Sequence, residues 1–366
     1  MPQPLLSLAS HLFSSVALAR RRWYASHPAA RRRLARPVIS IGNLSVGGTG
    51  KTPVVVAIAR LLIGMGERPA IISRGYKRQR SSEGVVVVSD GASVRADVAH
   101  AGDEPFMMAR ALPNVVVLVS SQRYLGGRLA ETQFDCSVHL LDDGFQHLGL
   151  VRDLDLLIVT DDDLSKPRVL PLGRLREPLS AAAAADAILV SAGDALEPAQ
   201  VAGTLGVSQS FGFDRVIERA RAVRISGGAG DEVASAVYPG PVFAIAGIAK
   251  PQRFFDDVQH AGWSLAGTRA FADHHRFSPR EIADIERAAQ LAGAKAVLTT
   301  EKDMVRLEDA AAGASLIPML WVPLRVTIEP SFTPWLRDGL ARARAPRHTR
   351  DALSQSKGAV ERGGPG

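Results

Sequence analysis

The sequence predicts an α/β fold in which a mainly parallel sheet is flanked by helices and is followed by a second, smaller α/β region. Short runs that are apolar throughout, without alternation, are typical of strands buried on both faces of a parallel sheet. Stretches with helical periodicity, such as Pro53–Ile63 and Pro105–Leu112, separate these runs. In order, the runs are Val38–Ile41, Ala70–Ser73, Val85–Val88, Val115–Ser120, Val138–Leu141, Leu154–Thr160, Ala187–Ser191, Val242–Ile248 and Ala296–Thr300.

The first element is an amphipathic N-terminal helix within residues 4–24. Apolar side chains recur at helical spacing from Leu5 to Val16, but serines and a histidine interrupt them. The run is too short and too polar to span a bilayer comfortably, which needs ~20 mostly apolar residues. Three arginines and two aromatics follow in residues 20–24. This combination favours a helix that lies in the headgroup region of a membrane.

Three other interpretations of this segment stay open. A secretory signal carries its positive charges before the apolar run, whereas here they follow it. An organelle transit peptide is rich in arginine and poor in acidic residues, as this segment is. A helix that only packs on its own domain would show the same periodicity.

Positive charge is concentrated near the N-terminus. The chain has a net charge of +7, and nine Lys and Arg residues precede the first acidic residue, Glu67. Such a segment attracts an anionic partner, which is a nucleic acid, a lipid surface or a phosphorylated substrate. No nucleic-acid recognition module is visible, so we expect no nucleic-acid partner. The single cysteine, Cys136, excludes a disulfide within the chain and suits a reducing compartment.

We expect four segments along the chain. Residues 1–36 form the interfacial helix and a basic segment, and residues 37–230 form the main domain. Residues 231–335 form the smaller α/β domain, after a weakly patterned stretch rich in Gly, Ala and Ser. Residues 342–366 are basic and poor in apolar side chains, which is typical of a disordered tail.

A glycine-rich loop follows the first apolar run and precedes a helical stretch. It consists of Ser45, Val46, Gly47, Gly48, Thr49, Gly50, Lys51 and Thr52. Glycines let backbone N–H groups turn toward phosphate oxygens, while Lys51 would reach the β and γ phosphates and Thr52 would hold Mg²⁺. The general consensus has glycine where this chain has Ser45. The order of strand, loop and helix predicts a nucleotide-binding loop of the P-loop NTPase type.

Acidic pairs adjoin two further segments. Asp142 and Asp143 end an apolar run, where P-loop enzymes place a carboxylate near Mg²⁺. Asp103 and Glu104 precede the helical stretch 105–112. They are either capping charges or functional groups, in which case Asp103 accepts the proton of a substrate hydroxyl or supports the metal. Glu104 is a candidate metal ligand together with Thr52, Asp142 and Asp143.

Cationic and aromatic side chains near the predicted strand ends form a third group. Arginine forks suit phosphate groups. The candidates for binding the substrate are Arg74, Tyr76, Arg123, Arg174 and Arg176. Two histidines, His274 and His275, follow Asp273, and such a pairing suits proton transfer, although a structural histidine is the alternative.

Taken together and in this order, the motifs resemble the tetraacyldisaccharide 4′-kinase family, the membrane-associated lipid A kinases of Gram-negative bacteria. That family transfers the γ-phosphate of ATP to the 4′-hydroxyl of a tetraacyl glucosamine disaccharide 1-phosphate, which gives lipid IVA. The matching segments are Gly42–Pro53, Ser73–Tyr76, Gly102–Pro105, Asp142–His147, Leu170–Pro178, Phe243–Pro251, Phe271–Phe277 and Thr299–Asp303.

The resemblance implies roles for individual residues. Carried over by motif, the ATP and Mg²⁺ site comprises Lys51, Thr52, Asp142 and Asp143. Asp103 is implied as the base toward the 4′-hydroxyl, and a histidine is implied to assist it, with His274 favoured over His275. A small hydroxyl residue such as Ser45 fits this family better than the general consensus.

The lipid-linked substrate sets the expected partners. Arg123, Arg174 and Arg176 are candidates to hold its 1-phosphate. The N-terminal helix would meet the membrane, which places the protein at the cytoplasmic face of the inner membrane, and we expect a monomer.

Two rival functions stay open from sequence. A nucleotide-dependent switch or metallochaperone GTPase would need an Asn-Lys-x-Asp motif to recognise guanine, and the nearest string, Thr300–Asp303, does not fit it. A soluble small-molecule kinase would use the N-terminal helix only for packing.

Overall fold

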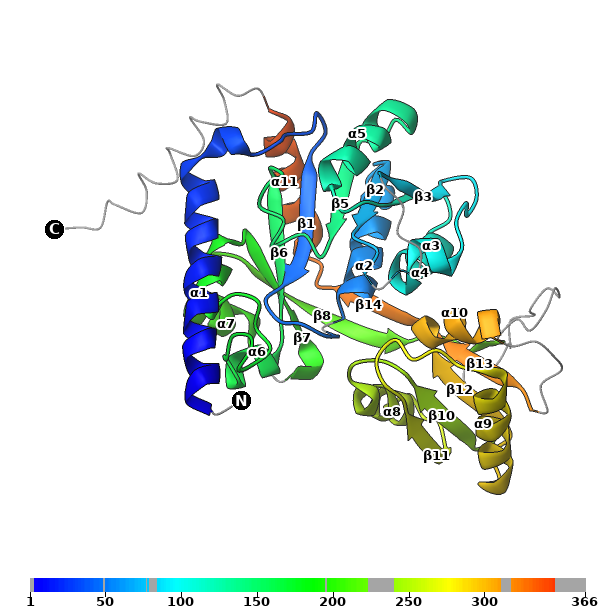
Figure 1. Ribbon diagram of the computed structural model, residues 1–366. Helices are drawn as coiled ribbons and strands as arrows, with labels where there is room; N and C mark the ends of the chain where they lie inside the picture. The colour runs from blue at the N-terminus through cyan, green and yellow to red at the C-terminus, as the bar shows by residue number, and fades with distance from the viewer. Residues whose placement is uncertain are drawn as a thin grey trace.

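Two sheets, each covered by helices, make up the molecule (Figure 1). The computed structural model of the chain describes residues 3–48, 50–76, 78, 84–194, 196–222, 240–310 and 317–345. In these residues the larger sheet has nine strands in the order β14-β8-β7-β6-β1-β5-β2-β4-β3, and the smaller has five in the order β11-β10-β12-β13-β9. Each sheet with its helices is called the large lobe and the small lobe below.

The large sheet is parallel except at its two edges, where β3 and β14 pair antiparallel with β4 and β8. Its strands are β1 (Val38–Asn43), β2 (Pro69–Ser73), β3 (Val86–Asp90), β4 (Val116–Val119), β5 (Val138–Asp142), β6 (Leu154–Val159), β7 (Ala187–Ser191), β8 (Ser210–Ile217) and β14 (Leu324–Ile328). The first seven coincide with the predicted apolar runs within two residues, and the predicted mainly parallel α/β sheet is confirmed.

Helices cover both faces of the large sheet, as buried strands on a parallel sheet require. On one face lie α2 (Lys51–Gly64), α4 (Asp103–Ala111) and α11 (Phe332–Arg344). On the other lie α1 (Gln3–Ser26), α5 (Arg123–Gln133) and α7 (Pro198–Leu205). The short elements are η1 (Pro28–Ala30), α3 (Val98–Ala101), α6 (Asp161–Ser165), η2 (Leu179–Ala184) and η3 (Ala192–Asp194).

The small lobe repeats the same layering. Its strands are β9 (Arg221–Ala222), β10 (Val242–Ala246), β11 (Leu265–Ala270), β12 (Ala296–Thr300) and β13 (Met319–Val322). One face is covered by α8 (Pro251–His260) and the other by α9 (Pro279–Leu291) and α10 (Glu301–Ala310). Met107 of α4 packs into the core under α9 and α10, so the two lobes share apolar contact there.

The lobe boundaries differ from the predicted domain limits. β14 and α11 belong to the large lobe, whereas the smaller domain was predicted to extend to residue 335. β14 is a half-buried edge strand that pairs with β8, more than 100 positions earlier, and no local pattern marks such a pairing. α11 also continues to Arg344, into the predicted tail, and residues 346–366 of that tail lie outside the described part of the chain.

One two-stranded ribbon connects the lobes. β8 and β14 pair in the large sheet, and their continuations β9 and β13 pair in the small sheet. Only Pro323 separates β13 from β14, and its carbonyl accepts a hydrogen bond from the Glu218 backbone at 3.0 Å. The chain therefore enters and leaves the small lobe at adjacent points.

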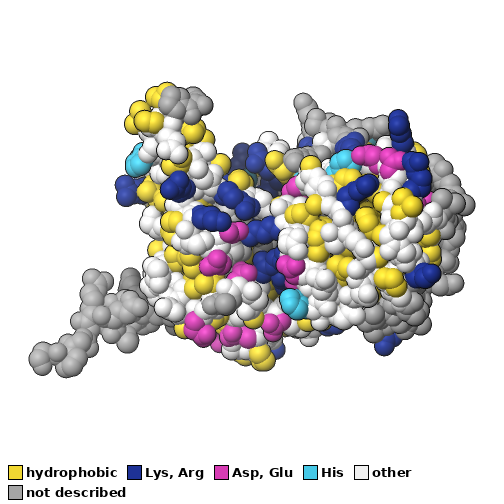
Figure 2. All heavy atoms as spheres, turned by 90° about the horizontal axis from the view of Figure 1, so that it is seen from below, with side chains coloured by type: hydrophobic (Ala, Val, Ile, Leu, Met, Phe, Trp, Pro, Cys, Tyr) yellow, Lys and Arg dark blue, Asp and Glu magenta, His cyan; other side chains and the backbone are white. Residues whose placement is uncertain are grey.

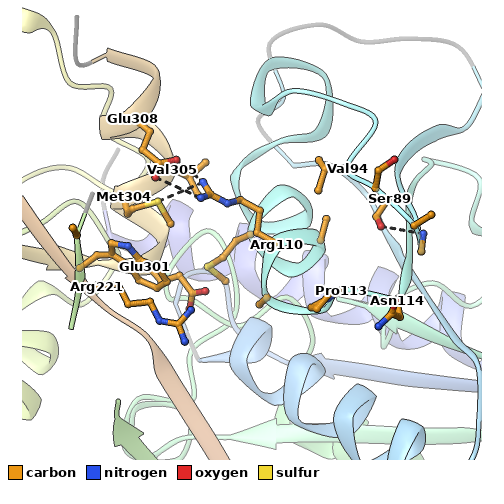
Figure 3. Close-up of a pocket in the computed structure, with 18 residues that line it drawn as sticks. Ser89, Val94, Arg110, Pro113, Asn114, Arg221, Glu301, Met304, Val305 and Glu308 are labelled. Atoms are coloured by element: carbon orange, nitrogen blue, oxygen red, sulfur yellow. Dashed lines mark hydrogen bonds and ion pairs between the residues drawn. The ribbon is translucent and has the colours of Figure 1, made fainter. Parts of the chain in front are cut away.

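A cavity of about 520 Å³ opens between the lobes (Figure 3). Figure 3 shows Glu301 and Arg221 of the small lobe on one wall and Ser89, Pro113 and Asn114 of the large lobe on the other. The cavity is lined by none of the predicted nucleotide-binding residues. Burial raises the pKa of the Glu301 carboxyl to about 7.

The raised pKa of Glu301 makes stability depend on pH. The folded state holds this proton at higher pH than the unfolded chain, so stability is lost as pH rises from about 4.5 to above 7. We expect Glu301→Gln to increase the free energy of unfolding by about 2–3 kcal/mol at pH 8 and by almost nothing at pH 4.5. Urea unfolding at both pH values measures this, and an equal gain at both would contradict it.

α11 packs into the core of the large lobe. Phe332 is fully buried and its ring lies 5.1 Å from that of Phe211. Phe332→Ala is expected to cost about 3–5 kcal/mol in urea unfolding. Leu291→Ala, at a leucine that is 90% exposed, is the control and should change stability very little. A Phe332→Ala cost as small as that of the control would place α11 outside the core.

Candidate active site

The glycine-rich loop lies at the carboxyl end of β1, the strand between β5 and β6 in the sheet. β1 is buried along its whole length, and α2 begins at Lys51 directly after the loop. Gly47 and Gly50 have φ values of 99° and 80°, a region that side chains with a Cβ rarely adopt. This is the strand, loop and helix geometry that cradles phosphates. Thr49, the remaining predicted loop residue, lies outside the described residues.

Asn43, which the sequence reasoning missed, fixes the base of this loop. It is fully buried, and its side-chain amide donates to the backbone carbonyl of Ser45 at 2.8 Å. Its Oδ1 accepts from Lys51 Nζ at 2.7 Å and from Arg176 Nη2 at 2.6 Å. A polar residue closing an otherwise apolar run was the one signal that the sequence offered.

The predicted acidic pair lies beside this loop. Asp142 ends β5, with Ile41 of β1 as its cross-strand neighbour. Its Oδ2 accepts from Ser73 Oγ at 2.9 Å, while Oδ1 is buried without a hydrogen-bond partner among the described residues. Asp143 follows with a left-handed φ of 53°. Its Oδ2 and Oδ1 accept hydrogen bonds from Arg176 Nη1 and Nη2, each at 2.7 Å. Lys51 Nζ lies 3.5 Å from Asp143.

The two carboxyls have opposite electrostatic environments. Burial, and then the charges of Glu104 and Asp143, raises the pKa of Asp142 to about 6. Burial would also raise the pKa of Asp143, but Lys51 and Arg176 outweigh it and hold that pKa well below its usual range. Asp143 is thus held ionised by cations, whereas Asp142 lacks a direct cationic partner for one buried oxygen.

This donor set fits Mg²⁺ bound together with a nucleotide. Mg²⁺ takes one or two protein carboxylates, with phosphates and waters completing its octahedron. The unpartnered oxygen of Asp142 and the neighbouring Thr52, at the start of α2, supply oxygen ligands of that kind. Within the described residues there is no group of three or more His, Cys, Asp or Glu side chains suited to hold a metal by themselves.

A second group of functional side chains bridges the lobes. Asp103 stands at the first turn of α4, and its Oδ2 lies 3.0 Å from His274 Nδ1 of the small lobe. Burial acts to raise the pKa of Asp103, but the hydrogen bond with His274 and the charge of Arg306 lower it. His274 has a left-handed φ of 64°, which places its ring toward α4. His275 instead contacts Glu281 through Nε2 at 3.0 Å.

Lys302 and Arg306, both unpredicted, complete this second group from α10. Lys302 Nζ lies 3.1 Å from Glu104 Oε1 and 3.3 Å from His274 Nε2. Arg306 Nε lies 3.6 Å from Asp103 Oδ2. Glu104 raises the pKa of Asp142 through its charge, so the acid–histidine group lies beside the metal-associated pair. The structure therefore brings the predicted acids Asp142, Asp143, Asp103 and Glu104 into one region.

The predicted arginines separate into two sets. Arg123 is buried and donates to the backbone carbonyls of Ser120 and Asp142, and burial lowers its pKa to about 10. Arg174 donates to the Val46 carbonyl at 2.8 Å, where any Cβ at Gly47 would collide with it. With the Arg176–Asp143 pair above, these three guanidinium groups support the loop and the acids. Arg74 and Tyr76 are exposed, and the Tyr76 ring lies 6.1 Å from that of His274.

Basic side chains gather between α1 and the acidic pair. Burial, followed by the charges of Arg123, Arg152, Arg20 and Arg74, lowers the pKa of His147 to about 4. Arg21 of α1 stacks on the Phe145 ring at 4.3 Å and pairs with Glu177 at 2.6 Å. Figure 2, seen from below, shows Lys and Arg side chains collected in the hollow that crosses the middle of the molecule.

The outer surface of α1 is apolar. Leu8, Leu12 and Val16 expose 68%, 66% and 60% of their areas, while Ser10 on another side of the helix donates to the Val169 carbonyl at 2.7 Å. No helix in the described part of the chain has the length and apolarity that a bilayer span requires.

Comparison with known proteins identifies relatives along nearly the whole chain. A family described as tetraacyldisaccharide-1-P 4′-kinase matches residues 2–341. The tetraacyldisaccharide 4′-kinase of Desulfotalea psychrophila is 39% identical over 298 residues, covering 81% of this chain and 84% of its own. That of Geobacter metallireducens is 41% identical over 281 residues, covering 75% and 80%.

A solved structure shares the fold. LpxK from Aquifex aeolicus, crystallised in complex with ATP, superposes with a TM-score of 0.72 at 30% identity, covering 93% of this chain and all of its own. The family match, the identities and this superposition agree with the motif order from Gly42 to Asp303. The chain belongs to the tetraacyldisaccharide-1-P 4′-kinase family.

Proposed function

We propose that the protein transfers the γ-phosphate of ATP to the 4′-hydroxyl of a tetraacyl glucosamine disaccharide 1-phosphate and so produces lipid IVA. The proposal is supported above all by the Asp103–His274 pair, which joins the two lobes beside the acidic pair in a member of this family. Such an arrangement has a cradle for the donor and a separate base for the acceptor.

In the proposed reaction the hydroxyl oxygen forms a bond to the γ-phosphorus while the bond to the ADP oxygen breaks. Asp103 accepts the hydroxyl proton, since its lowered pKa keeps it ionised near neutral pH. Lys51 and the loop amides neutralise charge on the transferring phosphoryl group. Thr52, Asp142 and Asp143 would hold Mg²⁺, with Glu104 alongside, and bound Mg²⁺ would neutralise further phosphate charge.

The contacts of Arg123, Arg174 and Arg176 favour roles other than the predicted grip on the 1-phosphate. Arg123 and Arg176 donate through their Nη groups to the acidic pair and its strand, which supports a role in holding those acids. Arg174 is engaged with the loop carbonyl of Val46. We infer that the 1-phosphate binds instead near Arg20 and Arg74, whose charges act on His147 and whose side chains are exposed.

We further propose that α1 lies on the cytoplasmic face of the inner membrane and that the protein acts there as a monomer. The exposed apolar side chains of α1 lead directly into its arginines, and a helix of this kind binds anionic lipid through both. A lipid extracted from that surface would then meet the basic side chains beside the acidic pair.

The GTPase alternative finds no support in the site. Asp303, in the string nearest to a guanine-recognition motif, is fully buried. Its oxygens accept from Gly247 N, Thr300 Oγ1 and Arg306 Nη2, which leaves it unavailable to a guanine base. Competition between ATP and GTP for the purified protein tests this directly.

The role of Asp103 is tested by Asp103→Asn, which keeps the side-chain shape and removes the charge. With tetraacyl disaccharide 1-phosphate, labelled ATP and Mg²⁺, turnover should fall by about 10²–10⁴-fold. ATP affinity should change little, since Asp103 lies outside the phosphate loop. Asp97→Asn, at the N-cap of the preceding helix α3, is the matched control and should keep full turnover. Retained turnover in Asp103→Asn would remove this residue from the base role.

The membrane role of α1 is tested by the triple change Leu8→Ser, Leu12→Ser and Val16→Ser. These side chains are exposed, so the fold should persist while binding to anionic phospholipid vesicles falls at least about tenfold. Cosedimentation with vesicles gives the affinity. Leu291→Ser, at an exposed leucine of the small lobe, is the control. Undiminished vesicle binding in the triple variant would contradict the interfacial role.

A further inference from the structure

Lys302 occupies the junction between the lobes at the acid–histidine group. It lies in the first turn of α10, and its side chain is 17% exposed. Its Nζ is 3.1 Å from Glu104 Oε1, 3.3 Å from Asp273 Oδ1 and 3.3 Å from His274 Nε2. An ammonium group has three N–H donors and no acceptor. The three neighbours therefore match the three donors. Glu104 belongs to the large lobe, whereas Asp273 and His274 belong to the small lobe.

This arrangement favours one position for the imidazole proton. Because the ammonium of Lys302 only donates, a hydrogen bond between Nζ and Nε2 of His274 requires Nε2 to accept and the ring proton to be on Nδ1. Nδ1 lies 3.0 Å from Asp103 Oδ2, which as a carboxylate oxygen accepts that proton's hydrogen bond. Both ring nitrogens then have partners of the correct polarity.

We propose that Lys302 is a positioning residue that holds His274 neutral and protonated at Nδ1, so that His274 orients the Asp103 carboxylate while Asp103 alone receives the hydroxyl proton. The part about Asp103 rests on the proposed function, whereas the tautomer follows from the contacts of Lys302. In this assignment His274 donates throughout and does not store the substrate proton.

The Asp273 carboxylate lies close enough to Nε2 of His274 to compete with Lys302 for it. Asp273 Oδ2 lies 3.7 Å from His274 Nε2, beyond hydrogen-bond distance, and its Oδ1 is engaged by Lys302. Without Lys302, Asp273 would be the nearest partner of Nε2 and would favour a proton there. That would give either an imidazolium, which places a positive charge beside Asp103, or the opposite tautomer, which leaves Nδ1 without a proton for Asp103. The Tyr76 ring contacts His274 edge-on, and Arg306 faces Asp103 instead.

The backbone around His274 supports a fixed ring. His274 N donates to the Gly247 carbonyl at 3.2 Å, and Gly247 N donates to Asp303 Oδ2 at 3.0 Å. These two hydrogen bonds connect the loop that carries His274 to α10. Hydrogen bonds thus link α10, which carries Lys302, to the loop that carries His274. Neighbouring His275 stacks on Phe271 at 4.8 Å and lacks any contact with Lys302 among the described residues.

The wild-type protein provides the first test. With histidines labelled by ¹⁵N, two-dimensional NMR distinguishes the two neutral tautomers and the imidazolium, and His274→Gln assigns the signal by its loss. In the absence of nucleotide and lipid at pH 7.5, we expect one protonated nitrogen, Nδ1, and one unprotonated nitrogen, Nε2. A proton on Nε2 in the wild type would overturn the proposal, whether or not any variant folds.

Lys302→Met provides the second test. It removes the donor while keeping an unbranched side chain, so the His274 signals should change to those of the imidazolium or the Nε2-protonated tautomer. The kcat should fall at least about tenfold, as loss of a charge-assisted hydrogen bond implies, with little change in the KM for ATP. An unaltered His274 signature in Lys302→Met would overturn the role of the lysine.

A matched control separates this role from simple support of the lobe interface. Glu308→Gln weakens the Arg110–Glu308 ion pair, which joins the same two helices, α4 and α10, away from His274. The His274 signature should stay unchanged in this variant. The NMR readout needs no turnover, so an inactive wild type with the expected tautomer would refute the proposed reaction and leave the tautomer assignment standing.

Discussion

Two adjacent carboxylates at the end of β5, of which Asp142 is buried and Asp143 partly exposed, are the constraint on which the site depends. An isolated buried charge is costly, so paired acids must be met by cations or hydrogen-bond donors. Lys51 and Arg176 meet Asp143, while Arg123 supports the strand end below Asp142. One Asp142 oxygen remains without a partner, which is the feature that a bound cation would relieve.

The same cations also bond to the phosphate loop. Arg176 bonds both Asp143 and Asn43, and Asn43 in turn bonds the loop and Lys51. A change in the acidic pair would therefore disturb the loop through shared hydrogen bonds. The small lobe also contacts this region. Its Lys250 forms an ion pair with Asp162 at 2.5 Å, and Asp162 lies 3.8 Å from Arg174, which bonds to the loop.

Sequence patterns predicted the parts of this site that local signals encode. The central strands are continuous apolar runs, and the loop residues from Ser45 to Thr52 are consecutive, so both were found. β14 was missed because it is a half-buried edge strand whose partner is remote. Asn43 and Lys302 were missed because each is a single polar residue whose importance comes from partners up to 198 positions away. The arginines were predicted as candidates, but only their contacts show which of them support the loop and the acids.

The continuous ribbon between the lobes has a consequence for how the chain is divided. Ile217 and Leu324 are cross-strand neighbours, so the chain leaves the large sheet and returns to it at the same place. The residues between them form an insertion into the large lobe. Excising that insertion and joining the two strands by a short turn would leave the nucleotide cradle and the acidic pair intact in one piece. It would remove His274 and Lys302 while retaining Asp103. The groups proposed to hold the phosphate donor thus come from the large lobe, whereas those proposed to act on the acceptor come from both lobes.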